Sequence, residues 1–131
     1  MKSTRALFLL AAVAALGASA ASFAHHSFPA TYQIDQKITI KGTVIQFMFR
    51  NPHSILHVQA PGADGKMYRW VVEWGAAGAL GRSGQVTRDV LKPGDEVIIV
   101  GNPGRNEADH KLRMNTIERP KDGWKWGGEF E

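Results

Sequence analysis

The stretch QKITIKGTVIQFMF, from Gln36 to Phe49, decides the fold class. β-Branched and aromatic residues dominate it, which favours a strand over a helix. It is long for one straight strand, and Gly42 lies in its interior. Because an interior glycine often marks a bend or a bulge, we expect one long, coiled strand that serves two sides of a small barrel.

Four further strands are expected along the chain. Each is a short run rich in β-branched, aromatic and other apolar residues between turn signals: Ser54–Ala60, Met67–Trp74, Glu96–Val100 and His110–Glu118. An Ala- and Gly-rich segment after the third strand predicts a short helix over Ala76–Leu80. This order predicts an all-β fold, a small five-stranded OB-like Greek-key barrel with a short helical insertion between strands 3 and 4. A β-sandwich is the alternative, but five strands are few for that architecture.

The first 24 residues have the pattern of an export signal. Lys2 and Arg5 precede an apolar run that is too short to span a bilayer, and small residues follow it. Cleavage is expected after Ala20 or Ala24, and we favour Ala24. The sequence thus predicts a protein of the periplasm or the extracellular space with three parts: a signal peptide over 1–24, a barrel domain over 25–119 and a Gly- and Trp-containing tail over 120–131.

The composition argues against several classes of protein. The chain has 131 residues and no cysteine, which excludes disulfides and a lipid anchor on a cleavage-site cysteine. Its net charge of +4 falls to +2 without residues 1–24, because two of the 16 basic side chains are lost and 14 then face 12 acidic ones. This weak charge, with no basic run, argues against a nucleic-acid partner. No second apolar segment is long enough to predict a membrane span after processing.

Histidines at the predicted cleavage site point to copper. Cleavage after Ala24 would leave His25 with two nitrogens, the α-amine and ring Nδ1, that can close a chelate ring on one cation. A third nitrogen from a distant histidine completes the planar set that Cu(II) prefers, and His53, in an Asn-Pro-His turn, is the preferred donor. His26 offers a second mode, through the amine, the intervening amide and its own ring. The predicted function is an exported binding protein that holds copper through His25 and His53, with His26 in reserve.

A second hypothesis is a binding module for a small organic ligand or another exported protein. Its candidate residues lie on the predicted strands, although we favour packing in the core for the two tryptophans: His57, Trp70, Glu73 and Trp74. His57 follows His53 by four residues, roughly 13 Å along a strand, so the two are not expected to share one metal. An enzyme is the third alternative and is not favoured, since Glu73 and His53 are its only acid/base candidates and no nucleophile motif is present.

The order of short motifs resembles an uncharacterised family of small exported bacterial proteins, known as a domain of unknown function. The segments that carry the likeness are Ala24–Phe28, Asn51–His53, Trp70, Glu73 and Lys92–Asp95. Together they cover about His25 to Ile117, most of the expected mature chain. The resemblance implies an exported, β-rich domain and directs attention to four residues, His25, His26, His53 and Glu73; it implies no activity.

Overall fold

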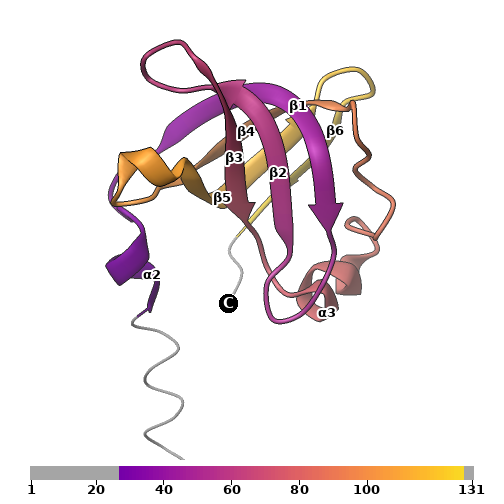
Figure 1. Cartoon of the computed structure of the whole chain (residues 1–131). Coiled ribbons are helices and arrows are strands. Elements are labelled where there is room, and N and C mark those ends of the chain that lie inside the picture. Colours follow the sequence, from indigo (N-terminus) through magenta and orange to yellow (C-terminus); the bar gives the residue numbers. More distant parts are fainter. Residues whose placement is uncertain (1–26, 129–131) are drawn as a thin grey trace, which may run out of the picture. The chain divides into compact units, whose positions relative to one another are not determined.

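The computed structural model describes residues 27–128, so the predicted signal peptide, His25 and His26 lie outside the described residues. Ser27–Thr31 forms a short helix, α2. The residues from Tyr32 to Gly128 form a β-barrel (Figure 1). Within the described range, no helix is long and apolar enough to cross a membrane.

Six strands and three short helical segments build the barrel unit. In chain order they are β1 (Ile38–Met48), β2 (Ile55–Pro61), β3 (Met67–Glu73), α3 (Ala77–Leu80), η1 (Gly81–Ser83), β4 (Glu96–Pro103), η2 (Glu107–Asp109), β5 (Lys111–Arg119) and β6 (Trp124–Gly127). The strands are hydrogen-bonded in the order β3-β2-β1-β4-β5-β6, and a parallel pairing of β3 with β5 closes the ring. This confirms the predicted fold class: five strands close the barrel, and the short helix α3 lies between β3 and β4.

The long strand β1 serves two sides of the barrel, as expected. Its first half pairs with β4 and its second half with β2, with Thr43 at the crossover. The β1–β2 register shifts between Val44 and Gln46, which is a β-bulge. Phe47, rather than Gln46, therefore pairs with the buried Leu56. The bulge thus breaks the simple alternation of the sequence and brings Phe47 to Trp74, at a ring-centroid distance of 5.7 Å.

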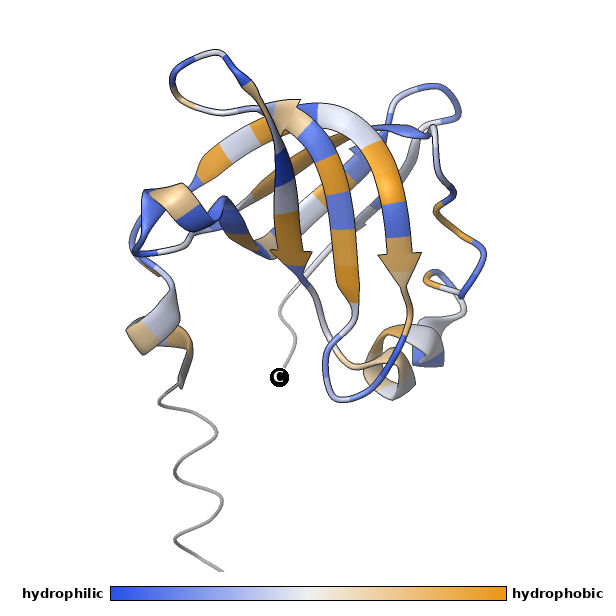
Figure 2. Cartoon of the chain, in the orientation of Figure 1, coloured by the Kyte–Doolittle hydropathy of each residue, from blue (hydrophilic) through white to orange (hydrophobic). Residues whose placement is uncertain are grey.

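The core fills the inside of this ring. Figure 2 shows hydrophobic and hydrophilic positions alternating along β1 and β2, as expected for strands with one buried face. The largest fully buried side chains come from every strand of the closed barrel and from the β3–β4 segment: Val44, Leu56, Val58, Val72, Trp74, Val86, Ile99, Leu112, Met114 and Ile117. The predicted placement of Trp70 and Trp74 in the core is correct, with 7% and 0% of their surfaces exposed.

The C-terminal segment adds a strand that the sequence pattern did not indicate. β6 pairs antiparallel with the second half of β5. Trp126 packs edge-on against the buried Trp74, with ring centroids 5.0 Å apart, and the Trp124 indole donates a hydrogen bond to the Gln85 carbonyl. The tryptophans of the predicted tail thus anchor it to the barrel.

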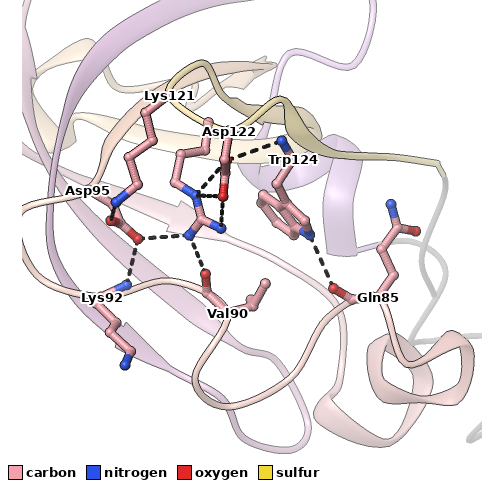
Figure 3. Close-up of polar contacts among 8 residues, drawn as sticks. Gln85, Val90, Lys92, Asp95, Lys121, Asp122 and Trp124 are labelled. Carbon is pink, nitrogen blue, oxygen red and sulfur yellow. Dashed lines mark hydrogen bonds and ion pairs between the residues drawn. The ribbon is translucent and has the colours of Figure 1, made fainter.

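A buried carboxylate ties the start of β4 to the end of β5 (Figure 3). Asp95 is 8% exposed. Its two oxygens accept hydrogen bonds from the Arg119 guanidinium at 2.9 Å, from Lys121 Nζ at 3.1 Å and from the Lys92 amide at 3.0 Å. Arg119 also donates to the Val90 carbonyl at 2.5 Å. One charged cluster therefore fixes the β3–β4 segment against both strands.

Gly42 is required where β1 crosses β2. A Cβ at this position would lie 2.2 Å from the Gln59 carbonyl oxygen and 2.8 Å from the Ala60 Cβ. We predict that Gly42→Ala lowers the free energy of unfolding by about 1 to 3 kcal/mol, because the backbone of β2 must move to admit the methyl group. Urea denaturation measures this. Gly78→Ala is the control, since a Cβ in α3 meets nothing closer than 3.9 Å, and a loss as large in the control would contradict the explanation.

The Asp95 cluster predicts sensitivity to acid. Burial alone would raise the pKa of Asp95, but the hydrogen bonds from Lys92, Lys121 and Arg119 outweigh it and hold the pKa below the ordinary value. The stabilisation is therefore complete above the ordinary pKa, about 4, and is lost as the pH falls through the lower pKa of the folded state. We predict that Asp95→Asn destabilises the protein at pH 7 by about 1 to 3 kcal/mol and flattens the loss of stability below pH 4.

Urea unfolding between pH 7 and pH 3 tests the Asp95 prediction. Asp89→Asn, at an exposed position on the same segment, is the matched control. An Asp95→Asn curve parallel to that of the wild type would exclude Asp95 as a source of the acid sensitivity.

Candidate functional site

Three residues that are far apart in the sequence meet on the outside of the barrel: Tyr32, His53 and Glu73. Glu73 is the last residue of β3, and its register partner at the start of β2 is Ile55. His53 precedes Ile55 by two residues, so the register carries it to the same end of β3. Tyr32 opens the barrel unit and forms an isolated β-bridge with Gly104, just after β4. Sheet register and closure of the barrel thus bring the three side chains together.

The Glu73 carboxylate is the centre of this group. Its Oε2 accepts a hydrogen bond from the Tyr32 hydroxyl at 2.5 Å, and its Oε1 is paired with Nδ1 of His53. Tyr32 is 2% exposed, and the side chains of Glu73 and His53 are 19% and 40% exposed. The contacts therefore run from a buried phenol, through a mostly covered carboxylate, to an imidazole at the surface.

The loop that presents His53 is fixed at its base. Ser54 is fully buried, its amide donates to the Gly75 carbonyl at 2.9 Å, and its carbonyl accepts from the Trp74 amide at 2.9 Å. Helix α3 holds the other side of the loop, because the Gly78 amide donates to the Asn51 side chain at 3.2 Å. The Asn51–Pro52 peptide bond is cis. His53 is thus presented by a rigid scaffold, as its position in an Asn-Pro-His turn had suggested.

The electrostatics of Tyr32, His53 and Glu73 favour one arrangement of hydrogen-bond donors around the Glu73 carboxylate. Burial raises the pKa of Tyr32 well above its ordinary value, the hydrogen bond and charge of Glu73 raise it further, and Arg113 opposes them. Tyr32 therefore remains a protonated donor throughout the neutral range. With the phenol O–H on one oxygen, a neutral His53 keeps its proton on Nδ1 for the other, which makes Nε2 the lone-pair nitrogen of the ring.

The other predicted site residues lie elsewhere in the barrel. Trp74 is enclosed in the core, and Trp70 lies in the core nearer the opposite end of β3. His57 is on the outer face of β2, and its buried Nδ1 has no hydrogen-bond partner among residues 27–128. Burial, followed by the charges of Arg69 and Arg50, lowers the pKa of His57. Of the predicted residues in the described range, His53 and Glu73 are the pair that the fold brings into contact.

Tyr32 is the member of this group that sequence reasoning missed. It lies outside every strand and helix, next to α2, so no periodic pattern marks it. Its contact with Glu73 spans 41 positions in the chain. The available signal was its place shortly after the His25–His26 pair, which was not enough to assign it a partner.

Within residues 27–128, no three histidine, aspartate or glutamate side chains converge as the ligands of a metal ion. His53 is the predicted ligand that lies inside this range, and Glu73 contacts it through Nδ1. A carboxylate on the other ring nitrogen is the usual support of a metal-bound histidine. The chemistry of this donor therefore fits a metal at Nε2.

Comparison with protein families identifies the chain. Residues 12–113 match the model of a family of unknown function, DUF6152. The chain belongs to the DUF6152 family. No curated protein and no solved structure matches it. Membership of a family of unknown function agrees with the resemblance found in the sequence, and it leaves the function of this DUF6152 protein to be argued from the site itself.

The hydrogen bond between Tyr32 and Glu73 predicts a measurable contribution to stability. Tyr32→Phe keeps the buried ring and removes the donor, so we expect a loss of about 1.5 to 3 kcal/mol, as for hydrogen bonds to charged groups. Tyr68→Phe is a matched control, because the Tyr68 hydroxyl donates to the exposed Asp64 at 2.6 Å, and we expect a smaller loss. Urea unfolding at pH 7 compares the two, and equal losses would contradict the importance given to the Glu73 contact.

Proposed function

We propose that this DUF6152 protein is an exported copper-binding protein, in which the processed N-terminal His25 and the barrel residue His53 hold the ion. The observation that carries the proposal is the pairing of Glu73 with Nδ1 of His53. A histidine held in this way presents Nε2 to a metal in a fixed orientation. Glu73 is in turn fixed by the buried Tyr32.

The proposed ligand set is three nitrogens. Cleavage after Ala24 would expose the α-amine of His25, and this amine with ring Nδ1 of the same residue would form a chelate. Nε2 of His53 would complete the set. Nitrogen donors in a planar arrangement suit Cu(II), which also has the highest affinity among the divalent first-row metals. When bound, copper would supply a redox-active centre, and the residues of this chain would hold and orient it.

Chain length supports the participation of His25. Seven positions separate His25 from Tyr32, and a segment of that length spans at most roughly 25 Å. Tyr32 and His53 contact the two oxygens of the same carboxylate. Ser27–Thr31 forms helix α2, which is shorter than an extended chain, so the covalent chain keeps the N-terminal nitrogen within this distance of Tyr32. His26 is the competing ligand, since it can bind copper through the terminal amine and the intervening amide without any contribution from the barrel.

Export is part of the proposal, because the α-amine of His25 exists only after processing. The pattern of residues 1–24 and the lack of cysteine support a periplasmic or extracellular protein whose copper ligands are nitrogens. Binding of an organic ligand is the second candidate function. A cavity lined by Tyr68, Trp70 and His110 favours it.

Two measurements on the exported protein test copper binding. Mass spectrometry of the mature chain should give a first residue of His25. Titration with Cu(II), followed by electron paramagnetic resonance, should then show one site with three nitrogen ligands from two residues. We predict that His53→Ala weakens binding at least tenfold and changes the spectrum. His57→Ala, in the adjacent strand β2, should leave both unchanged.

Two results would exclude the proposed copper site formed by His25 and His53. A mature chain that begins at Ala21 would have no amine at His25, and the proposed site could not form. If His53→Ala left the spectrum unchanged, the terminal dipeptide alone would be the ligand, and the barrel would have no part in binding. A variant with one glycine added before His25 should lose the three-nitrogen site, because the amine is then displaced from the chelate.

A further inference from the structure

A second site lies at the mouth of the barrel, at the end opposite α3. A cavity of about 520 Å³ opens there between the start of β1, the β2–β3 turn and the β4–β5 loop. Its lining includes Gln36, Thr39, Asp64, Tyr68, Trp70 and His110. The volume is within the range of small-molecule sites, and barrel mouths are common places for them. His53 and Glu73 are at the other end of β2 and β3, so this cavity is distinct from the proposed copper site.

One wall of the cavity is a stack of aromatic rings. Tyr68 and His110 are stacked with ring centroids 3.8 Å apart and planes inclined by 19°. The indole of Trp70 meets His110 edge-on at 5.2 Å. The Tyr68 hydroxyl is fixed by Asp64 at 2.6 Å, and Nδ1 of His110 lies 3.1 Å from the Ala108 carbonyl. The positions of these rings are therefore fixed by contacts within the protein.

The backbone at His110 is strained. Its φ of 45° and ψ of 49° are in the left-handed region, which a residue with a side chain rarely adopts. Glycine would adopt this conformation more easily, yet the residue here carries the ring that forms the wall. Strain of this kind persists where the surrounding structure imposes it, and it is concentrated at ligand sites. This points to a use for the His110 ring beyond forming the turn.

The Trp70 indole supplies an unused donor in the lining of the cavity. Its Nε1 is shielded from water and has no hydrogen-bond partner among residues 27–128, and the residue is 7% exposed. A buried donor without an acceptor is uncommon and needs an explanation. The acceptor of a bound ligand would provide one after a small displacement of the ring. Trp74 has an unpartnered Nε1 as well, but it is not part of the cavity lining.

The charges around the mouth favour a neutral ligand. The lining includes acidic residues, Asp64 and Glu107, and the basic Lys111, so charges of both signs are present. The Asp64 carboxylate is already occupied by the Tyr68 hydroxyl and the Lys66 amide. The remaining polar lining includes amide side chains such as Gln36, which both donate and accept hydrogen bonds. Nothing in this arrangement resembles the cationic or anionic cluster that a charged ligand needs.

We propose that the barrel mouth binds a neutral, planar aromatic molecule with a carbonyl oxygen, stacked against the Tyr68–His110 wall. The rings supply stacking energy, the amides contact the polar edge, and the carbonyl oxygen satisfies the Trp70 indole. This site goes beyond copper binding and does not depend on it.

Coumarin, a neutral bicyclic lactone, is a suitable probe, and ¹H–¹⁵N NMR of the mature protein gives a residue-specific readout. The chain has four tryptophans, so four indole N–H signals are observable. We expect saturable binding that shifts the Trp70 signal and leaves those of Trp74, Trp124 and Trp126 in place. Shifts of similar size at all four indoles, or no saturable shift at the solubility limit of coumarin, would overturn the proposal.

The variant His110→Gly removes the ring from the Tyr68–His110 wall without requiring the backbone to change. Glycine accepts the left-handed backbone, so the variant should still fold and unfold cooperatively in urea, whereas coumarin affinity should fall at least tenfold. His53→Ala is the matched control and should bind coumarin normally. His110→Gly should retain copper binding, so failure of either site is visible independently of the other. Unchanged coumarin affinity in a folded His110→Gly protein would exclude the wall as the binding surface.

Discussion

The proposed copper site depends on the contact between the Glu73 carboxylate and Nδ1 of His53. One of its oxygens accepts the Tyr32 hydroxyl, and the other is paired with the His53 ring. A carboxylate this well covered would be costly without partners, and two donors from distant parts of the chain satisfy it. The same contacts decide which nitrogen of His53 carries the proton. The same glutamate side chain therefore links Tyr32 to the barrel and orients the His53 ring.

The barrel makes this contact possible through its long first strand. β1 pairs with both β2 and β4, and the bulge after Val44 lets it bend between them. Gly42 admits the close approach of β2. The β2–β3 register then places Ile55 beside Glu73, and the return of β5 to β3 closes the ring. His53 and Glu73 are not among the residues that line the cavity, and Tyr32 contacts both regions, through its bridge to the cavity residue Gly104 and its hydrogen bond to Glu73.

Much of the fold could be predicted because its signals are local. Runs of β-branched residues marked the five barrel strands, and Gly42 marked the bend. The position of the bulge could not be predicted, because the interior glycine that suggested a bend precedes the register shift between Val44 and Gln46. β6 was also missed, because its four residues join the sheet through backbone pairing with β5 rather than through a long apolar pattern.

Only part of the site could be predicted, because residue types are local signals whereas contacts between distant residues are not. His53 and Glu73 were singled out by residue type and by their places in a turn and a strand. Their contact depends on strand register, which a single sequence does not specify. Tyr32 was missed because its position follows from bridging Gly104, a contact that becomes visible only once β4 and β5 are placed. His110, at the barrel mouth, is marked by a backbone conformation and by a stack with Tyr68, and neither can be read from residue type.

The tautomer of His53 tests the central claim most directly. Long-range ¹H–¹⁵N NMR of the metal-free protein, at a pH where the ring is neutral, distinguishes the two ring nitrogens. We expect a protonated Nδ1 and an unprotonated Nε2, and we expect Glu73→Gln to shift this balance. Addition of Cu(I), which is diamagnetic, should then shift the Nε2 resonance of the mature protein. A proton on Nε2, or an Nε2 signal that does not respond to Cu(I), would contradict a copper site supported by Glu73.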